Sequence, residues 1–248
     1  MFKLVVSDET MSNHHLLLWL EAPLQAWGHD SRFGRRDSLD FPTKSGVLGI
    51  IACARGVGGA ERDWLAVMAD QSMEVHAYVR KDQKGKGVPR LPLLRDFHMV
   101  GAGYDDQSPW QTLLTPKKSD GSKAVGGGVK MTYRYYVQDM AYAVLLTLPA
   151  DQAEQIVSAL QAPVWDLYLG RKNCVPTEFI YQGCFESIEV ARETAADLAN
   201  AKGRVSSFVV YDGDGDEFAG EVVSINDVPI QFGERKLYRD RRVTVATQ

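Results

Sequence analysis

The feature that most constrains this chain is the stretch of residues 81–130, which lacks the periodicity of a helix or strand over most of its length. It contains eight glycines and four prolines, and three of the glycines are consecutive at positions 126–128. Both residue types disfavour the interior of regular elements. The two segments at its ends, 93–100 and 131–138, have the pattern of strands. We therefore predict a protruding β-hairpin with an irregular tip.

This insertion is also strongly basic. Between Arg80 and Tyr136 there are eleven basic and five acidic residues, a net charge of +6 within a chain of net charge −4, so the remainder carries −10. A positive segment on an acidic body indicates a local surface for a polyanion. The alternative interpretation is a solvated loop whose lysines serve solubility.

The elements around the insertion predict an α+β fold. Apolar periodicity favours strands at 15–20, 75–80 and 141–148, one helix that starts near Thr43, and another at 151–160. With the insertion, the order becomes strand, helix, strand, hairpin, strand, helix. This order is typical of a ferredoxin-like βαββαβ core, the fold of RNA-recognition domains.

We expect four regions along the chain. They are an N-terminal extension at 1–13, a core formed by 14–80 and 131–185, the basic hairpin insertion at 81–130, and a smaller β-rich C-terminal extension at 186–248. Within the C-terminal extension we predict a short helix near 188–198. A hairpin should follow it, with strands at 205–211 and 218–225.

Composition argues against a metal site, a disulfide framework and a membrane segment. The three cysteines, Cys53, Cys174 and Cys184, form no CxxC pair, and the five histidines lack metal-ligand spacing. The apolar runs are far shorter than a membrane span, and the N-terminus lacks the features of a secretory signal. We therefore expect a cytoplasmic protein with reduced thiols and without a metal or cofactor.

The start of the first predicted helix combines features of a phosphate site. Residues 42–46 include Lys44 and Ser45, but the full phosphate-loop pattern GxxxxGK[ST] is absent, which argues against an NTPase. The helix start could still hold one phosphate. Equally, it could be a plain N-cap formed by Thr43.

Basic and aromatic residues occur together in three places, as in proteins that hold single-stranded RNA with phosphates on cations and bases on rings. These places are Trp27 near Arg32 and Arg36, Phe97 and His98 near Arg95, and Tyr133, Tyr135 and Tyr136 around Arg134. Some of these rings must also pack the core. His98 could act as a general acid or base in metal-free RNA cleavage, or it could stack on RNA or pack locally.

Four segments have a characteristic order and spacing: 24–28 (LQAWG), 41–49 (FPTKSGVLG), 94–98 (LRDFH) and 168–174 (YLGRKNC). Together they resemble the CasD family, the RAMP-superfamily subunits of type I-E CRISPR Cascade complexes. The resemblance extends from about His14 to the C-terminus. It implies a ferredoxin-like RAMP core with a long β-hairpin thumb, which would be the basic insertion.

The resemblance implies a non-catalytic RNA-binding subunit of a ribonucleoprotein complex. Such a subunit binds the 5′ handle of the CRISPR RNA, caps a filament of CasC backbone subunits and lies near the large subunit CasA. It would meet target DNA only through the assembled complex, in antiviral defence. Relatives of type I-C instead cut the precursor RNA, so a metal-independent endoribonuclease that uses His98 remains the alternative. A purely structural adaptor is a third interpretation.

The expected RNA-binding residues fall into three groups. Loop side chains would read bases, and cations would fix the phosphates in register. The first group is Gln25, Trp27, Arg32, Arg36, Lys44 and Ser45, the second is Arg95, His98 and Arg134, and the third is Tyr168, Arg171 and Lys172. By the resemblance, none of them is catalytic and none binds a metal.

Overall fold

The computed structural model describes residues 13–29, 31, 34–100, 107–109, 118, 120–122, 130–214 and 219–247. Nearly all of the predicted N-terminal extension and most of the tip of the predicted hairpin lie outside the described residues, as does Arg32. None of the described helices is long and apolar enough to cross a membrane.

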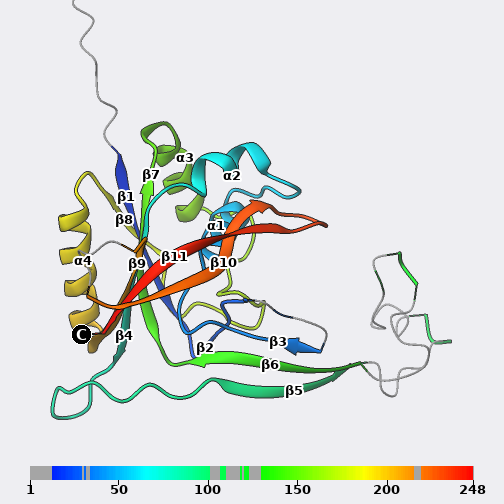
Figure 1. Cartoon of the computed structure of the whole chain (residues 1–248), viewed down its shortest axis with the longest axis horizontal. Helices are drawn as coiled ribbons and strands as arrows, with labels where there is room; N and C mark the ends of the chain where they lie inside the picture. The colour runs from blue at the N-terminus through cyan, green and yellow to red at the C-terminus, as the bar shows by residue number, and fades with distance from the viewer. Residues whose placement is uncertain are drawn as a thin grey trace, which may run out of the picture.

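Most of the described strands form one seven-stranded sheet in the order β10-β11-β9-β4-β7-β1-β8 (Figure 1). The described pairings within this sheet are all antiparallel. Its strands are β1 (His14–Glu21), β4 (Met73–Arg80), β7 (Ala141–Leu148), β8 (Tyr181–Phe185), β9 (Arg204–Asp212), β10 (Glu221–Gln231) and β11 (Leu237–Thr247). The predicted α+β class is thus confirmed in its coarse form, a mixed chain with antiparallel sheets.

Helices cover both faces of this sheet, which explains the uninterrupted apolar run in β1. Leu16, Leu18 and Leu20 belong to the main core, whereas Leu17 and Trp19 belong to a smaller core on the other face. Side chains alternate along a strand, so a strand that is buried on both faces must be apolar at every position. The helices are α1 (Lys44–Ala54), α2 (Arg62–Met68), α3 (Ala150–Gln161) and α4 (Ile188–Ala201).

The two cores receive different helices. Apolar side chains of α1, α2 and α3 fill the main core, and α4 contributes Ala191, Ala195 and Ala199 to the smaller one. These alanines are four residues apart and therefore form one stripe, which lets α4 lie close to the sheet. Figure 1 shows α4 on one side of the sheet and α1 to α3 on the other.

A second, smaller sheet carries a long two-stranded ribbon. It contains β2 (Leu24–Gln25), β3 (Arg35–Arg36), β5 (Leu94–Val100) and β6 (Lys130–Gln138). β5 and β6 pair antiparallel from Leu94 opposite Tyr136 to Val100 opposite Lys130, and the ribbon extends away from the main sheet in Figure 1. The two flanking strands of the predicted hairpin are therefore present, and they pair with each other.

The C-terminal strands differ from the prediction. We predicted that residues 205–211 and 218–225 pair as a hairpin, but β11 lies between β9 and β10 and pairs with both. The prediction missed β11 because residues 239–242 are four consecutive charged residues that interrupt its apolar alternation. One of them, Arg241, is buried and belongs to an ion network.

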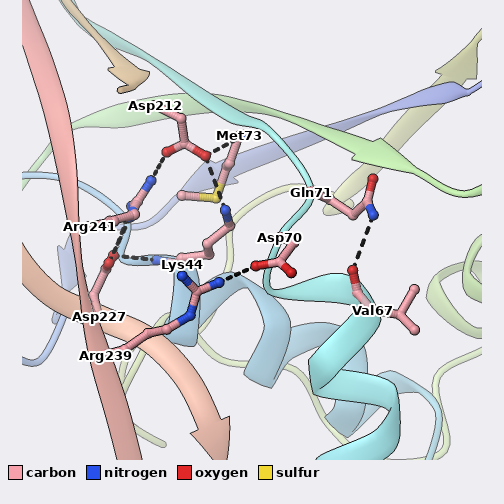
Figure 2. Close-up of polar contacts among 9 residues, drawn as sticks. All are labelled: Lys44, Val67, Asp70, Gln71, Met73, Asp212, Asp227, Arg239 and Arg241. Carbon is pink, nitrogen blue, oxygen red and sulfur yellow. Dashed lines mark hydrogen bonds and ion pairs between the residues drawn. The ribbon is translucent and has the colours of Figure 1, made fainter. Parts of the chain in front are cut away.

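This network joins α1 to the C-terminal strands (Figure 2). The Arg241 guanidinium donates to both carboxylate oxygens of Asp227 at 2.7 and 2.8 Å and also contacts Asp212. The Lys44 ammonium lies 3.0 Å from Asp212, whose carboxylate also accepts the backbone N–H of Met73 at 3.0 Å. Burial lowers the pKa of Lys44, although the nearby Asp212 opposes that shift.

The network also fixes the start of α1. The backbone N–H of Lys44 donates to Asp227 at 2.7 Å, and the Thr43 hydroxyl accepts the backbone N–H of Gly46 at 3.1 Å. Of the two interpretations of this helix start, the N-cap through Thr43 is therefore confirmed. The negative charge at the helix N-terminus is supplied by Asp227, a residue of the protein itself.

We expect Asp227→Asn to destabilise the fold by about 3 kcal/mol, because it leaves the buried Arg241 guanidinium without its main counter-charge. The matched control is Asp70→Asn, which removes a carboxylate from the exposed Asp70–Arg239 pair also drawn in Figure 2. That change should cost less than about 1 kcal/mol. Urea unfolding measures both values, and equal costs for the two variants would contradict the role we assign to the network.

Candidate nucleic-acid interface

One hollow lies between the β5–β6 ribbon and the loop that follows α3. It has a volume of about 520 Å³, and we call it the basic hollow. Its lining residues are His98, Arg134, Tyr168, Gly170, Arg171, Lys172 and Asn173. Five of the predicted RNA-binding residues, from three separate parts of the sequence, are thus brought together here.

The register of the ribbon determines which side chains reach the basic hollow. Asp96 lies opposite Arg134, and His98 lies opposite Thr132, so these four share one face of the ribbon. His98 Nε2 is hydrogen-bonded to the Asp96 carboxylate. This bond uses Nε2 and orients the imidazole, so Nδ1 is the ring nitrogen that can bind a further partner.

Arg95 lies on the opposite face of the ribbon and does not belong to the basic hollow. Its guanidinium carbon is 5.5 Å from the centre of the Tyr133 ring. The Phe97 ring packs against the same ring, with 5.2 Å between the two ring centres. We had predicted that Arg95 and His98 act together because they are close in sequence. Residues three apart on a strand point to opposite faces, and the structure separates them accordingly.

The loop that contains Tyr168 is held to the ribbon by Arg171. The Arg171 guanidinium donates to the carbonyl oxygens of Tyr135 at 3.0 Å and Arg36 at 2.9 Å, and it lies 4.4 Å from the centre of the Tyr136 ring. These contacts occupy the guanidinium within the protein. We therefore assign Arg171 a positioning role, which leaves Lys172 as the exposed cation of this loop.

Gly170 allows the same loop to approach the segment around Ala26. Its φ is +89°, and a Cβ at this position would lie 1.6 Å from the carbonyl oxygen of Ala26. The backbone N–H of Ala26 donates to the carbonyl of Leu169 at 3.1 Å. Only glycine fits this turn without displacing the backbone.

A second hollow adjoins the first at Tyr168 and Gly170, and we call it the aromatic hollow. It has a volume of about 460 Å³. Its floor is the face of α1 that carries Gly46 and Gly49, and Tyr168 and Gly170 line both hollows. Aromatic side chains of Trp27, Trp165, Tyr168, Phe232 and Tyr238 line its walls. The C-terminal hairpin thus contributes to it.

Polar and ionisable groups also line the aromatic hollow. Ser45, another predicted RNA-binding residue, is half-buried there, and Glu61 and Lys236 are further lining residues. Cys53 lies at the same wall, and burial raises the pKa of its thiol. A raised thiol pKa favours the neutral form, so this cysteine is not activated as a nucleophile.

The structure places three predicted residues where they cannot present a polar group to RNA. Gln25 is completely buried, and its amide donates to the carbonyl of Met140 at 2.7 Å. Lys44 is 3% exposed and paired with Asp212. Trp27 is also fully buried, so it can contribute only a wall of the aromatic hollow. Gln25 and Lys44 therefore serve the fold through these buried contacts.

Arg36 contributes a backbone group to this region. Its carbonyl oxygen accepts a hydrogen bond from Arg171, and its side chain is half-buried. Some residues that line the two hollows were not among the predicted RNA-binding residues. They are Asn173, Trp165, Phe232, Lys236 and Tyr238. Asn173 lies inside a segment that we had singled out, so its position could have indicated it. The residues of the C-terminal hairpin gave no such signal, because β11 itself was not predicted.

Among the residues that the structure describes, no group of three or more histidine, cysteine, aspartate or glutamate side chains could hold a metal ion. Cys53, Cys174 and Cys184 are all free thiols. The chemistry that the described interface offers is therefore that of cations, aromatic rings and one histidine–aspartate pair.

Comparisons with known proteins show which family this chain resembles. The family model described as CRISPR-associated protein (Cas_Cas5) matches residues 15–244. The CRISPR system Cascade subunit CasD of Escherichia coli (strain K12) is 26% identical over 230 residues, which cover 90% of this chain and 94% of that protein. The resemblance to the CasD family that the sequence indicated is thereby confirmed.

Solved structures show the same fold. A chain of a CRISPR RNA-guided surveillance complex matches with a TM-score of 0.66 and 26% identity, over 94% of this chain and 90% of that chain. A crystal structure of a Cas protein matches with a TM-score of 0.58 and 24% identity, over 94% of both chains. Because the family model covers nearly the whole sequence, the chain belongs to the Cas5 family of CRISPR-associated proteins.

Proposed function

We propose that this chain is a non-catalytic CRISPR RNA-binding subunit of a type I-E Cascade complex, and that it holds the 5′ handle of the guide RNA. The observation that carries the proposal is the basic hollow, where Arg134, Lys172, His98 and Tyr168 meet from distant parts of the chain. Similarity to the Cascade subunit CasD supports the same assignment.

The basic hollow has the groups that single-stranded RNA requires. Lys172 is exposed and Arg134 is half-buried, so both can reach backbone phosphates. Tyr168 and His98 offer rings on which a base can stack. Arg171 holds the loop that carries Tyr168 and Lys172, which reduces the entropy lost on binding.

The strand order supports a ferredoxin-like core built from β1, α1, β4, β7, α3 and β8. Within the main sheet these strands lie in the order β4-β7-β1-β8, and α1 and α3 fill the core on one face. In this proposal the β5–β6 ribbon is the thumb. The strands of the C-terminal extension add to the edge of the same sheet beside β4.

The face of the ribbon away from the basic hollow suits a protein neighbour. Phe97, Met99, Met131 and Tyr133 are all exposed there, and Arg95 lies among them. Aromatic residues, methionine and arginine are enriched where proteins meet. We propose that contacts with the backbone subunit CasC involve this face, and that the large subunit CasA also adjoins this protein, within a cytoplasmic complex.

A second candidate function is metal-independent cleavage of precursor RNA. The hydrogen-bonded pair of His98 and Asp96 favours it, because the pair lies beside Arg134, Lys172 and Tyr168. A carboxylate-oriented imidazole can transfer a proton, and nearby cations can stabilise charge on a phosphate. We rank this candidate second because the chain is similar to CasD, a subunit of the Cascade system.

We expect Lys172→Gln and Arg134→Gln each to weaken binding of repeat RNA with its 5′ handle by about 10- to 100-fold. A charge-assisted hydrogen bond contributes about 1.5–3 kcal/mol, which corresponds to that range. The matched control is Lys84→Gln, at an exposed lysine in the turn before the ribbon. Fluorescence anisotropy measures the affinities. An equal loss of affinity in the control would contradict a specific site and indicate non-specific electrostatic attraction between the protein and RNA.

We expect repeat RNA to remain intact when it is incubated with the wild-type protein in EDTA and run on a denaturing gel, while a native gel shows a shifted band. A discrete cut that disappears in His98→Ala would replace our proposal with the endoribonuclease. If neither a shift nor a cut appears, even with CasC present, the adaptor interpretation would stand instead.

A further inference from the structure

Tyr168 and Gly170 line both the basic hollow and the aromatic hollow, so the two hollows adjoin at this loop. The first hollow offers cations, and the second offers aromatic walls over a glycine floor. An RNA strand has the same division, because its phosphates are charged and its bases are flat and largely apolar on their faces. The two adjoining hollows therefore offer the two kinds of group that one nucleotide requires.

The floor of the aromatic hollow is open because α1 carries glycine there. A Cβ at Gly49 would meet no atom within 4 Å, so the space above this residue is empty. Gly46 is different, since a Cβ there would lie 3.0 Å from the Trp27 ring. Packing of the protein itself thus accounts for Gly46. Glycine destabilises a helix interior relative to alanine, so Gly49, within an 11-residue helix, carries a cost that close approach of a ligand would explain.

The walls of this hollow are suited to a flat ring. Trp165 is 49% exposed and Tyr238 is 36% exposed, and Tyr168 lines this hollow as well as the basic one. Stacking on aromatic side chains is the usual way in which proteins hold an unstacked base. Ser45, Glu61 and Lys236 supply hydroxyl, carboxylate and ammonium groups at the same hollow, which could meet the polar edge of a base.

We propose that the aromatic hollow binds one unstacked base of the RNA whose phosphates lie in the basic hollow, and that Tyr168 is the wedge that separates this base from its neighbour. This inference rests on the proposed RNA-binding function and assigns a base site to it. The C-terminal hairpin then takes part in RNA recognition, since it contributes Phe232, Lys236 and Tyr238.

Gly49→Leu tests the site directly, because a leucine side chain would enter the empty space above α1 without meeting another group near its Cβ. Gly49→Ala is the matched control, because it also replaces glycine in the helix but its methyl group fills little of the hollow. The probe is handle-containing repeat RNA with 2-aminopurine placed at one position at a time. Its fluorescence rises when the base leaves the stack.

With the wild-type protein, we expect one position to gain fluorescence on binding. Gly49→Ala should retain that gain and the affinity, whereas Gly49→Leu should lose the gain and bind about tenfold more weakly, as expected for one lost stacking contact. Tyr168→Ala should also abolish the gain, and Tyr168→Phe should retain it. Trp165→Ala, at a half-exposed wall residue, repeats the test if Gly49→Leu lowers the melting temperature.

Other outcomes would overturn the inference in distinguishable ways. If the wild-type protein binds RNA but Gly49→Leu and Trp165→Ala leave fluorescence and affinity unchanged, the aromatic hollow is not a base site, while the proposed function survives. If those variants instead impair only assembly with partner subunits, the hollow binds a protein side chain. If the wild-type protein does not bind RNA even with CasC, both the inference and the proposed function fail.

Discussion

The carboxylate of Asp227 holds the N-terminus of α1 and the guanidinium of Arg241 at the same time. Through Arg241 and Asp212, the same network reaches Lys44 and the start of β4. It therefore fixes α1 against strands that lie about 170–200 residues later in the chain. The aromatic hollow depends on this constraint, because α1 provides its floor and the β10–β11 hairpin provides part of its wall. The ion network therefore helps to hold the floor and one wall of the aromatic hollow in place.

The basic hollow depends on a different attachment, the bonds from Arg171 to the carbonyl oxygens of Tyr135 and Arg36. These bonds satisfy carbonyl groups at the base of the ribbon and fix the distance between the ribbon and the loop after α3. The stacking of Arg171 on Tyr136 adds a cation–π contact in a partly buried place. Arg171, which the sequence predicted as an RNA-binding residue, thus also holds the loop that carries Lys172 against the ribbon.

The sequence predicted the elements whose residues follow one periodicity without interruption. β7 has the predicted bounds, and β1, β4 and α3 extend each predicted segment by one or two residues at an end. β11 was missed because burial of Arg241 depends on partners that are distant in sequence. The burial of Lys44 and Gln25 was not predicted for the same reason, because lysine and glutamine are usually exposed. Single-sequence patterns cannot reveal which charged side chains have a buried partner, because that partner is chosen by the tertiary fold.

The loop from Tyr168 to Lys172 shows how a short segment can serve both structure and recognition. Leu169 is buried in the main core and Arg171 binds the ribbon, whereas Tyr168 and Lys172 line the hollows between them. Gly170 makes the turn that this alternation needs, at a place where any side chain would meet Ala26. Leu169 and Arg171 fix the backbone of the loop before a ligand binds. Tyr168 and Lys172 therefore lose little conformational entropy on binding. Because Leu169 and Arg171 anchor the loop, Tyr168 is attached to a fixed backbone, which is the condition that the proposed wedge role requires.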